Sequence, residues 1–301
     1  MIHNLVSRNG QLLPVEQARL SPGQEGLING WGLFTTIRVF HGQPFAFDRH
    51  WRRLQRDARR IHIPFDFDPD RIYADVLELI RRNQALESAV RIYIVANRTG
   101  MWHSDEPFPE VDIILSAAPL PTYPESVRLD VREHCRHAAS PLSGVKTIAW
   151  LNNVWNLQEA HERGFDEVVL LNERGEVAEC TAANIFAVRS GEVLTPPLSS
   201  GCLAGITREV LLDICPRAGV PIREAVLRPE DLYGADELFI SSTNRNIVAA
   251  GEIAGHTIAA VPGPVTIKLG ELFSAYVPEE LVRSGEPVGA PGRPSAKPAA
   301  G

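Results

Sequence analysis

Apolar residues recur along the first part of the chain with the spacing of helices and of strands. Phe47, Trp51 and Leu54 begin a series at steps of three and four, which predicts an amphipathic helix over residues 46–61. The segment 72–80 predicts a second helix. Short apolar runs predict strands over residues 33–40, 90–96 and 111–117. We therefore expect an N-terminal α/β domain over residues 1–118.

A proline-rich stretch separates this part from the next. Pro119, Pro121 and Pro124 stand too close together for a helix or a central strand to continue through them, which predicts an interdomain linker over residues 119–126. After it, Val127, Leu129 and Val131 alternate with charged residues and predict a half-buried strand.

The remaining pattern predicts a larger, β-rich domain over residues 127–284. Hairpins are expected at residues 168–180 and 185–195, a helix at 205–217 and a strand at 237–241. Residues 285–301 are mostly Pro, Gly, Ala and Ser, which cannot bury a core, so we expect a disordered tail. The fold class is α/β of the α+β type.

Charge and composition limit the partners. The formal net charge of −7 disfavours nucleic-acid binding, although the helix at 46–61 carries several arginines on one face. We find neither a membrane span nor a secretion signal, and the four cysteines lack metal-ligand spacing. The run from His134 to His137 is interpreted as surface rather than as a metal site. A cytoplasmic protein without a metal is expected.

Lysine is rare in this chain. Of 30 basic residues only Lys146, Lys268 and Lys297 are lysine, and Lys146 lies in a segment without another formal charge. Burial favours the neutral amine of lysine, which is a nucleophile, whereas arginine stays protonated. Lys146 is therefore a candidate for covalent catalysis. A lysine that extends its amine to solvent from an apolar segment is the alternative.

Three further features suit a phosphorylated ligand, and each has an ordinary structural alternative. Ile206 and Thr207 open a predicted helix after Gly205, where free amides attract anions, but Thr207 also suits a plain helix cap. Ser242 and Thr243 follow a strand, as in many turns. One arginine of the helix at 46–61 could bind a small phosphate.

Glu179 lies in a strand-like segment among small and apolar residues. A carboxylate there requires a cation or a donor as partner. A protonated ring nitrogen of a cofactor is one such partner, and an internal salt bridge to an arginine is the other.

An amine able to form a Schiff base, a carboxylate and several phosphate-type positions together describe a pyridoxal-phosphate pocket. The chain resembles the class IV, or fold type IV, pyridoxal-phosphate enzymes, which include branched-chain aminotransferases, D-amino-acid aminotransferases and aminodeoxychorismate lyases. The matched stretches, in family order, are residues 30–39, His50-x-x-Arg53-Leu54, Lys146-Thr147, residues 179–186, residues 205–208 and residues 241–243.

The resemblance implies a two-domain fold, pyridoxal 5′-phosphate as cofactor and a homodimer. Lys146 is similar to the lysine that carries the cofactor and moves the substrate proton, and Glu179 to the carboxylate on the pyridine nitrogen. The other implied cofactor-binding residues are Arg53, Asn184, Ile206, Thr207 and Thr243. The implied substrate-binding residues are Arg38, Thr36 and Ser242.

Departures from the family pattern bear on the substrate. Residues 34–39 and 179–184 are similar to the aminodeoxychorismate lyases, and Leu151 replaces the tyrosine of the branched-chain enzymes. Residues 98–103 do not match the carboxylate-binding Arg-x-His of the D-amino-acid enzymes. We expect an aminotransferase that transfers the amino group of a hydrophobic or branched-chain amino acid to a 2-oxo acid. The alternatives are aminodeoxychorismate lyase and a protein that binds a phosphorylated ligand without turnover.

Overall fold

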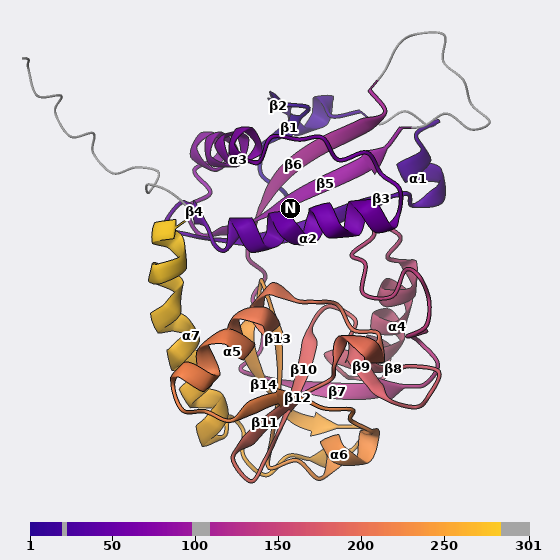
Figure 1. Cartoon of the computed structure of the whole chain (residues 1–301), viewed down its shortest axis with the longest axis vertical. Coiled ribbons are helices and arrows are strands. Elements are labelled where there is room, and N and C mark those ends of the chain that lie inside the picture. Colours follow the sequence, from indigo (N-terminus) through magenta and orange to yellow (C-terminus); the bar gives the residue numbers. More distant parts are fainter. Residues whose placement is uncertain (20–22, 98–108, 284–301) are drawn as a thin grey trace, which may run out of the picture.

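The computed structural model describes residues 1–19, 23–97 and 109–283. These residues form two β-sheets, which lie one above the other in Figure 1, the N-terminal sheet at the top. No helix in the described ranges has the length and apolarity needed to cross a membrane.

The N-terminal sheet has six strands in the order β2-β1-β6-β5-β3-β4, with antiparallel neighbours throughout. Helices α2 and α3 share one apolar core with β3, β5 and β6. The elements are β1 (Leu5–Arg8), β2 (Gln11–Pro14), a 3-10 helix (Val15–Gln17), α1 (Glu25–Asn29), β3 (Gly32–Phe40), β4 (Gln43–Pro44), α2 (Phe47–Arg60), α3 (Pro69–Asn83), β5 (Ser88–Ala96) and β6 (Val111–Pro119).

The two helices and three strands predicted in this part are confirmed, with small shifts at their ends. The largest shifts are at the two ends of α3, which begins three residues before the apolar pattern does and ends three residues after it. Pro69 occupies its first turn and the side chain of Asp68 accepts a hydrogen bond from the amide of Asp70. This cap, rather than a buried side chain, defines the beginning of the helix.

The second sheet has nine strands, eight of them in the order β12-β11-β10-β13-β14-β7-β8-β9, and β15 pairs with β14. Parallel and antiparallel pairs are mixed, and α5 and α7 cover one face. The elements are β7 (Ser126–Arg132), α4 (Leu151–Glu162), β8 (Glu167–Leu171), β9 (Val177–Cys180), β10 (Asn184–Arg189), β11 (Glu192–Thr195), a 3-10 helix (Leu198–Ser200), α5 (Ile206–Arg217), β12 (Ile222–Glu224), α6 (Pro229–Tyr233), β13 (Glu237–Ser242), β14 (Asn246–Ile253), β15 (His256–Thr257) and α7 (Pro264–Arg283).

Both predicted hairpins are confirmed as β8–β9 and β10–β11. In this part the sequence pattern missed α4, α6, α7, β12, β14 and β15, and in the N-terminal part it missed α1, β1, β2 and β4. Helix α4 exposes Leu151, Val154 and Trp155 instead of burying an apolar stripe, so its periodicity gave no core signal. Residues 120–125 connect β6 to β7, within the predicted linker. The remaining domain boundaries stay a prediction, and the predicted tail at 285–301 lies outside the described residues.

Ion pairs fasten α2 of the first part to two helices of the second. The guanidinium of Arg49 lies 2.6 Å from Glu209 and 2.7 Å from Asp213 on α5, and 3.3 Å from Glu280 on α7. In Figure 1, α7 runs along one side of the molecule from the lower sheet toward the upper one. These contacts hold α2 at the boundary where the cavity described next is found.

Candidate active site

A cavity of about 550 Å³ lies between the two sheets and is lined by residues of both. Its wall contains nine of the ten residues predicted from the sequence, and only Arg38 is not part of it. These nine are Thr36, Arg53, Lys146, Glu179, Asn184, Ile206, Thr207, Ser242 and Thr243. Residues more than two hundred positions apart in sequence, such as Thr36 and Thr243, therefore meet in one site.

Lys146 is placed by pairing of its main chain with β3. The amide of Phe34 donates to the carbonyl of Lys146 at 3.1 Å, and the amide of Ile148 donates to the carbonyl of Gly32 at 3.0 Å. The short edge strand β4 covers only the far end of β3, which leaves the beginning of β3 open to this segment. A chain segment that follows β7 is thereby fixed against the N-terminal sheet.

Two glycines permit this close approach. A Cβ on Gly32 would lie 2.6 Å from the side chain of Ile148 and 2.8 Å from the carbonyl of Ile94. Gly30 has a φ of +65°, and a Cβ there would meet Ala149 at 2.8 Å. The lysine segment packs directly on these two glycines. This contact explains why both positions of the matched stretch at residues 30–39 require glycine.

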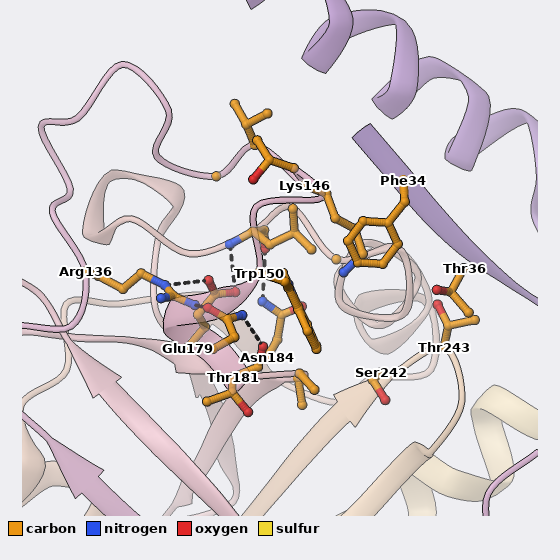
Figure 2. A pocket seen from close by; sticks show the side chains of 18 of the residues that line it. Phe34, Thr36, Arg136, Lys146, Trp150, Glu179, Thr181, Asn184, Ser242 and Thr243 are labelled. Carbon is orange, nitrogen blue, oxygen red and sulfur yellow. Dashed lines mark hydrogen bonds and ion pairs between the residues drawn. The ribbon is translucent and has the colours of Figure 1, made fainter. Parts of the chain in front are cut away.

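The amine of Lys146 lies among aromatic rings at the cavity wall (Figure 2). Its Nζ is 4.6 Å from the ring centre of Phe34 and 5.8 Å from that of Trp150. Burial, reinforced by the positive charge of Arg53, lowers the pKa of Lys146 from 10.5 to about 7. A large fraction of the amine is therefore neutral and nucleophilic at neutral pH, unlike an amine that extends to solvent.

Glu179 has two partners at the other side of the cavity (Figure 2). Its Oε1 accepts from Nε of Arg136 at 3.1 Å, and its Oε2 accepts from the amide of Leu203 at 3.0 Å. The internal salt bridge considered from the sequence is thus present. A carboxylate has about four acceptor positions, so Glu179 can still accept a hydrogen bond from a ligand N–H.

The interpretation of residues 134–137 as surface is wrong for Arg136. His134 and His137 are exposed, whereas the Arg136 side chain is 16% exposed, points at Glu179 and also donates to Asn153 at 3.0 Å. Among the described residues, no group of three or more His, Cys, Asp or Glu is placed to hold a metal ion. The sequence offered no signal that separated Arg136 from its exposed neighbours.

The N-terminus of α5 opens into the cavity. The helix begins at Ile206 after Gly205, which has no side chain to cap the first turn. The amides of Ile206 and Thr207, together with the positive end of the helix dipole, therefore suit an anion. Arg53 stands opposite, where its NH1 donates to the carbonyl of Ala204 at 3.1 Å.

Arg53 is held in this position by buried polar side chains. Its NH2 donates to Oγ1 of Thr35 at 2.8 Å, and this hydroxyl lies 2.6 Å from Nδ1 of His50. Because Thr35 accepts from Arg53, its own proton is directed to the ring of His50. Burial, together with Arg53 and Lys146, lowers the pKa of His50 well below its usual value, so the ring is neutral and accepts that proton.

Asn184 supports the turn before α5. Its Nδ2 donates to the carbonyl of Leu203 at 3.0 Å, and a Cβ on Gly205 would lie 1.9 Å from its Oδ1. Asn184 thus fills the space that only a glycine at position 205 leaves free, and it orients the amides of the helix N-terminus.

The substrate residues predicted from the sequence occupy different places. Thr36 and Thr243 lie next to each other in Figure 2, on the side of the view away from Glu179, and Ser242 follows below them. Arg38 instead reaches the main chain of the turn that follows Ser242, where its NH1 donates to the carbonyl of Asn244 at 3.4 Å. Residues 98–103, considered for carboxylate binding, lie outside the described residues.

These groups fit pyridoxal phosphate. A buried amine with a lowered pKa suits its aldehyde, a buried carboxylate suits its ring nitrogen, and an uncapped helix N-terminus beside Arg53 suits its phosphate. Lys146, Glu179 and Thr207 would hold these three parts of the cofactor.

Comparison with known proteins gives the class of this fold and site. The model of the amino-transferase class IV family matches residues 32–253. A putative branched-chain-amino-acid aminotransferase of Methanocaldococcus jannaschii is 31% identical, over 88% of this chain and 93% of that protein. The branched-chain aminotransferase of Thermoproteus uzoniensis, solved with norvaline, is 30% identical with a TM-score of 0.84, over 92% and 96% of the two chains. A putative 4-amino-4-deoxychorismate lyase of Legionella pneumophila shares the fold at 24% identity, with a TM-score of 0.80 over 86% and 97%.

The chain belongs to the class IV aminotransferase family. It is an enzyme that uses pyridoxal phosphate, as this family does, and a relative of the same fold has been solved with pyridoxamine 5′-phosphate. The predicted fold type IV architecture and cofactor are thereby confirmed. The alternative of a binding protein without turnover is set aside.

Proposed function

We propose that this enzyme transfers the amino group of a hydrophobic or branched-chain amino acid to a 2-oxo acid. The observation that carries the proposal is the Lys146 amine, with a pKa of about 7, beside the apolar rings of Phe34 and Trp150. These rings offer an apolar wall to the substrate side chain directly at the reacting amine. The two relatives reported above as branched-chain aminotransferases, one of them putative, support the same substrate class.

The bound cofactor supplies an aldehyde that reacts with amines and a ring that accepts electrons. Lys146 Nζ, once free, would accept the proton of the substrate α-carbon and donate it to the cofactor carbon that carried the aldehyde, since its pKa lies near the working pH. Glu179, fixed by Arg136 and Leu203, holds a proton at the ring nitrogen through its carboxylate. Arg53, Ile206 and Thr207 hold the phosphate.

The substrate contacts are also part of this proposal. Thr36 and Ser242, which line the cavity, are proposed to contact the substrate. Arg91 lines the same wall with an exposed side chain, 5.7 Å from the ring centre of Phe34. We propose that Arg91 binds the second carboxylate of a dicarboxylic acceptor such as 2-oxoglutarate, because a guanidinium matches a carboxylate.

A homodimer in the cytoplasm completes the proposal. Helix α4, which follows the Lys146 segment, exposes Leu151 (79%), Val154 (50%) and Trp155 (54%) on one side, an apolar face suited to a second copy.

The cysteines support the cytoplasmic location. All four are unpaired, and three of them are buried, as suits a reducing compartment.

Incubation of the purified enzyme with leucine and 2-oxoglutarate tests the reaction, and we expect glutamate and 4-methyl-2-oxopentanoate in equal amounts. The second candidate, aminodeoxychorismate lyase, rests on the likeness of residues 34–39 and 179–184 to that group, with Thr36 in the cavity wall. If the enzyme releases 4-aminobenzoate from aminodeoxychorismate and forms no glutamate from leucine or another amino acid, the proposed function is aminodeoxychorismate lyase and not aminotransferase.

A further inference from the structure

The proposed phosphate site is assembled from two helices that belong to different apolar cores (Figure 1). Trp51 and Leu54 of α2 pack in the core of the N-terminal sheet, whereas Val210 and Leu211 of α5 pack with α7 in a separate core. Arg53 on α2 and the first amides of α5 must nevertheless face the same anion. The relative position of these two half-sites therefore depends on polar contacts between the helices.

Arg49 supplies such contacts from the turn of α2 that precedes Arg53. Its NH1 donates to Oε1 of Glu209 at 2.6 Å and to Oδ2 of Asp213 at 2.7 Å. Glu209 lies in the first turn of α5, and Asp213 lies one turn further along the same helix. One guanidinium thus holds two successive turns of the helix whose N-terminus opens into the cavity.

Helix α7 fixes the same guanidinium from another direction. Nε of Arg49 donates to Oε1 of Glu280 at 3.3 Å, and NH2 donates to the hydroxyl of Tyr276 at 3.4 Å. This hydroxyl donates in turn to the other oxygen of Glu280 at 2.6 Å. The side chains of Arg49 and Glu280 are 12% and 8% exposed. The orientation of Arg49 is therefore fixed, and its charge is screened less than that of a surface arginine.

Arg49 and Arg53 together hold the beginning of α5. The two side chains are four positions apart on α2, so they lie on one face of the helix. Arg53 donates to the carbonyl of Ala204, directly before α5, at 3.1 Å, while Arg49 binds the carboxylate of Glu209. Both ends of the first turn of α5 are thus attached to α2.

We propose that Arg49 is a positioning residue for the cofactor phosphate. Its ion pairs with Glu209 and Asp213 hold the first turn of α5, so that the amides there face the same anion as Arg53. Arg49 does not line the cavity and acts through these groups, because amides at a helix N-terminus bind an anion only where they point at it. This inference rests on the phosphate position proposed above and not on the proposed substrate.

Two forms of the cofactor separate this role from a general effect on the fold. Pyridoxal has the aldehyde and the ring of pyridoxal phosphate but lacks the phosphate. In dialysis against decreasing concentrations of each form, R49Q should bind pyridoxal phosphate about 10-fold more weakly than wild type and pyridoxal equally well, since charge-assisted hydrogen bonds that orient the phosphate site are lost. R52Q removes an exposed arginine of the same helix and should bind both forms as wild type does. An equal loss for both forms in R49Q, or no loss, would overturn the proposal.

Loss of Arg49 also leaves Glu280 buried without its cation, which can disturb folding. The double variant R49Q/E280Q removes both charges of this buried pair. We expect it to fold, as measured by circular dichroism, and to show the same selective loss of pyridoxal phosphate. A folded double variant with wild-type affinity for pyridoxal phosphate contradicts the inference.

The variant E209A/D213A separates positioning from a direct effect of charge on the phosphate. Burial lowers the pKa of Arg53 to about 10, and the negative charge of Glu209 acts against this shift, so Glu209 lies close enough to affect a bound anion. Removal of two carboxylates would by charge alone strengthen phosphate binding. The same change cuts both contacts of Arg49 with α5, so we expect about 10-fold weaker binding of pyridoxal phosphate and unchanged binding of pyridoxal. Unchanged or stronger binding of pyridoxal phosphate would refute the positioning role.

R53Q tests the phosphate position itself. If R53Q selectively loses pyridoxal phosphate and the Arg49 variants do not, the phosphate position stands and the inference fails. If R53Q also keeps wild-type affinity for both forms, the phosphate position is wrong and the inference falls with it. These measurements need no turnover, so a failure to form glutamate from leucine counts against the proposed reaction alone.

Discussion

The main-chain amide of Lys146 donates to Oδ2 of Asp57 at 3.2 Å, which joins the reactive lysine to α2. The carboxylate is 1% exposed, and its other oxygen accepts from Arg56 at 2.7 Å. Asp57 therefore positions the lysine from the N-terminal part of the chain, just as β3 does through Phe34.

Replacement of Asp57 by alanine should lower both stability and turnover. The amide of Lys146 would stay buried without a partner, which costs about 1–3 kcal/mol in the free energy of unfolding. Urea unfolding measures this loss, and D57N should recover part of it because its amide oxygen still accepts. The exposed Asp66 gives the control D66A, which should stay within about 0.5 kcal/mol of wild type. Wild-type stability and activity of D57A would contradict the positioning role.

Much of this site could be predicted from the sequence because its chemistry depends on rare residue types. Lys146 stood out as one of three lysines, and Glu179 as a carboxylate in an apolar strand. The order of the motifs then gave the family, and with it the positions of Arg53 and Thr207. Nine of the ten predicted residues line one cavity.

What the sequence could not show depends on side-chain direction and on pairing between distant segments. Arg136 was grouped with exposed neighbours, although it turns inward to Glu179, and the pattern of the arginine-rich helix did not single out Asp57. Arg38 lies on the same strand face as Thr36, yet one further step along β3 carries it past the cavity to Asn244. The periodicity of the sequence around these residues does not specify where their side chains point.

The pH dependence of Lys146 is a direct test of its lowered pKa. In the cofactor-free enzyme, an amine reagent such as trinitrobenzenesulfonate modifies only neutral amines, so the rate at Lys146 should rise through a midpoint at about pH 7. Mass spectrometry of the labelled peptide measures this rate. In K146R the labelled site disappears, which assigns the signal. A midpoint near 10.5 would show that the amine is solvated.

The same lowered pKa predicts that removal of the Lys146 amine abolishes activity but raises the stability of the folded protein. Between pH 7 and 10.5 the unfolded chain holds a proton on Lys146 that the folded protein has released, so wild-type stability gains with rising pH in this window. K146M lacks this cost. In thermal unfolding of the cofactor-free proteins, its Tm should exceed that of wild type most at pH 7 and below, and the difference should shrink toward pH 10.5. An unchanged difference across the window would refute the shift.

Glu179→Gln tests the role of the negative charge of the carboxylate, because glutamine keeps one oxygen that accepts a hydrogen bond. Glutamine can still accept from the amide of Leu203, but it neither pairs with Arg136 nor holds a positive charge at the cofactor ring. We expect turnover to fall at least about 100-fold, the range seen when one electrostatic contact to a developing charge is lost. Visible absorbance should show that cofactor is still bound. E192Q, at a surface ion pair, is the control. Turnover within twofold of wild type would rule out this role.

Gly205→Ala and Gly270→Ala form a matched pair. A Cβ at position 205 would lie 1.9 Å from Oδ1 of Asn184, so Asn184 or the start of α5 must shift. Because the amides of that first turn suit the cofactor phosphate, G205A should hold the cofactor at least about 10-fold more weakly, as measured by dialysis against decreasing concentrations. Gly270 lies in α7 with open space around its Cβ position, so G270A should keep wild-type affinity and gain up to about 1 kcal/mol in stability. If both variants retain the cofactor equally, the helix N-terminus is not its phosphate site.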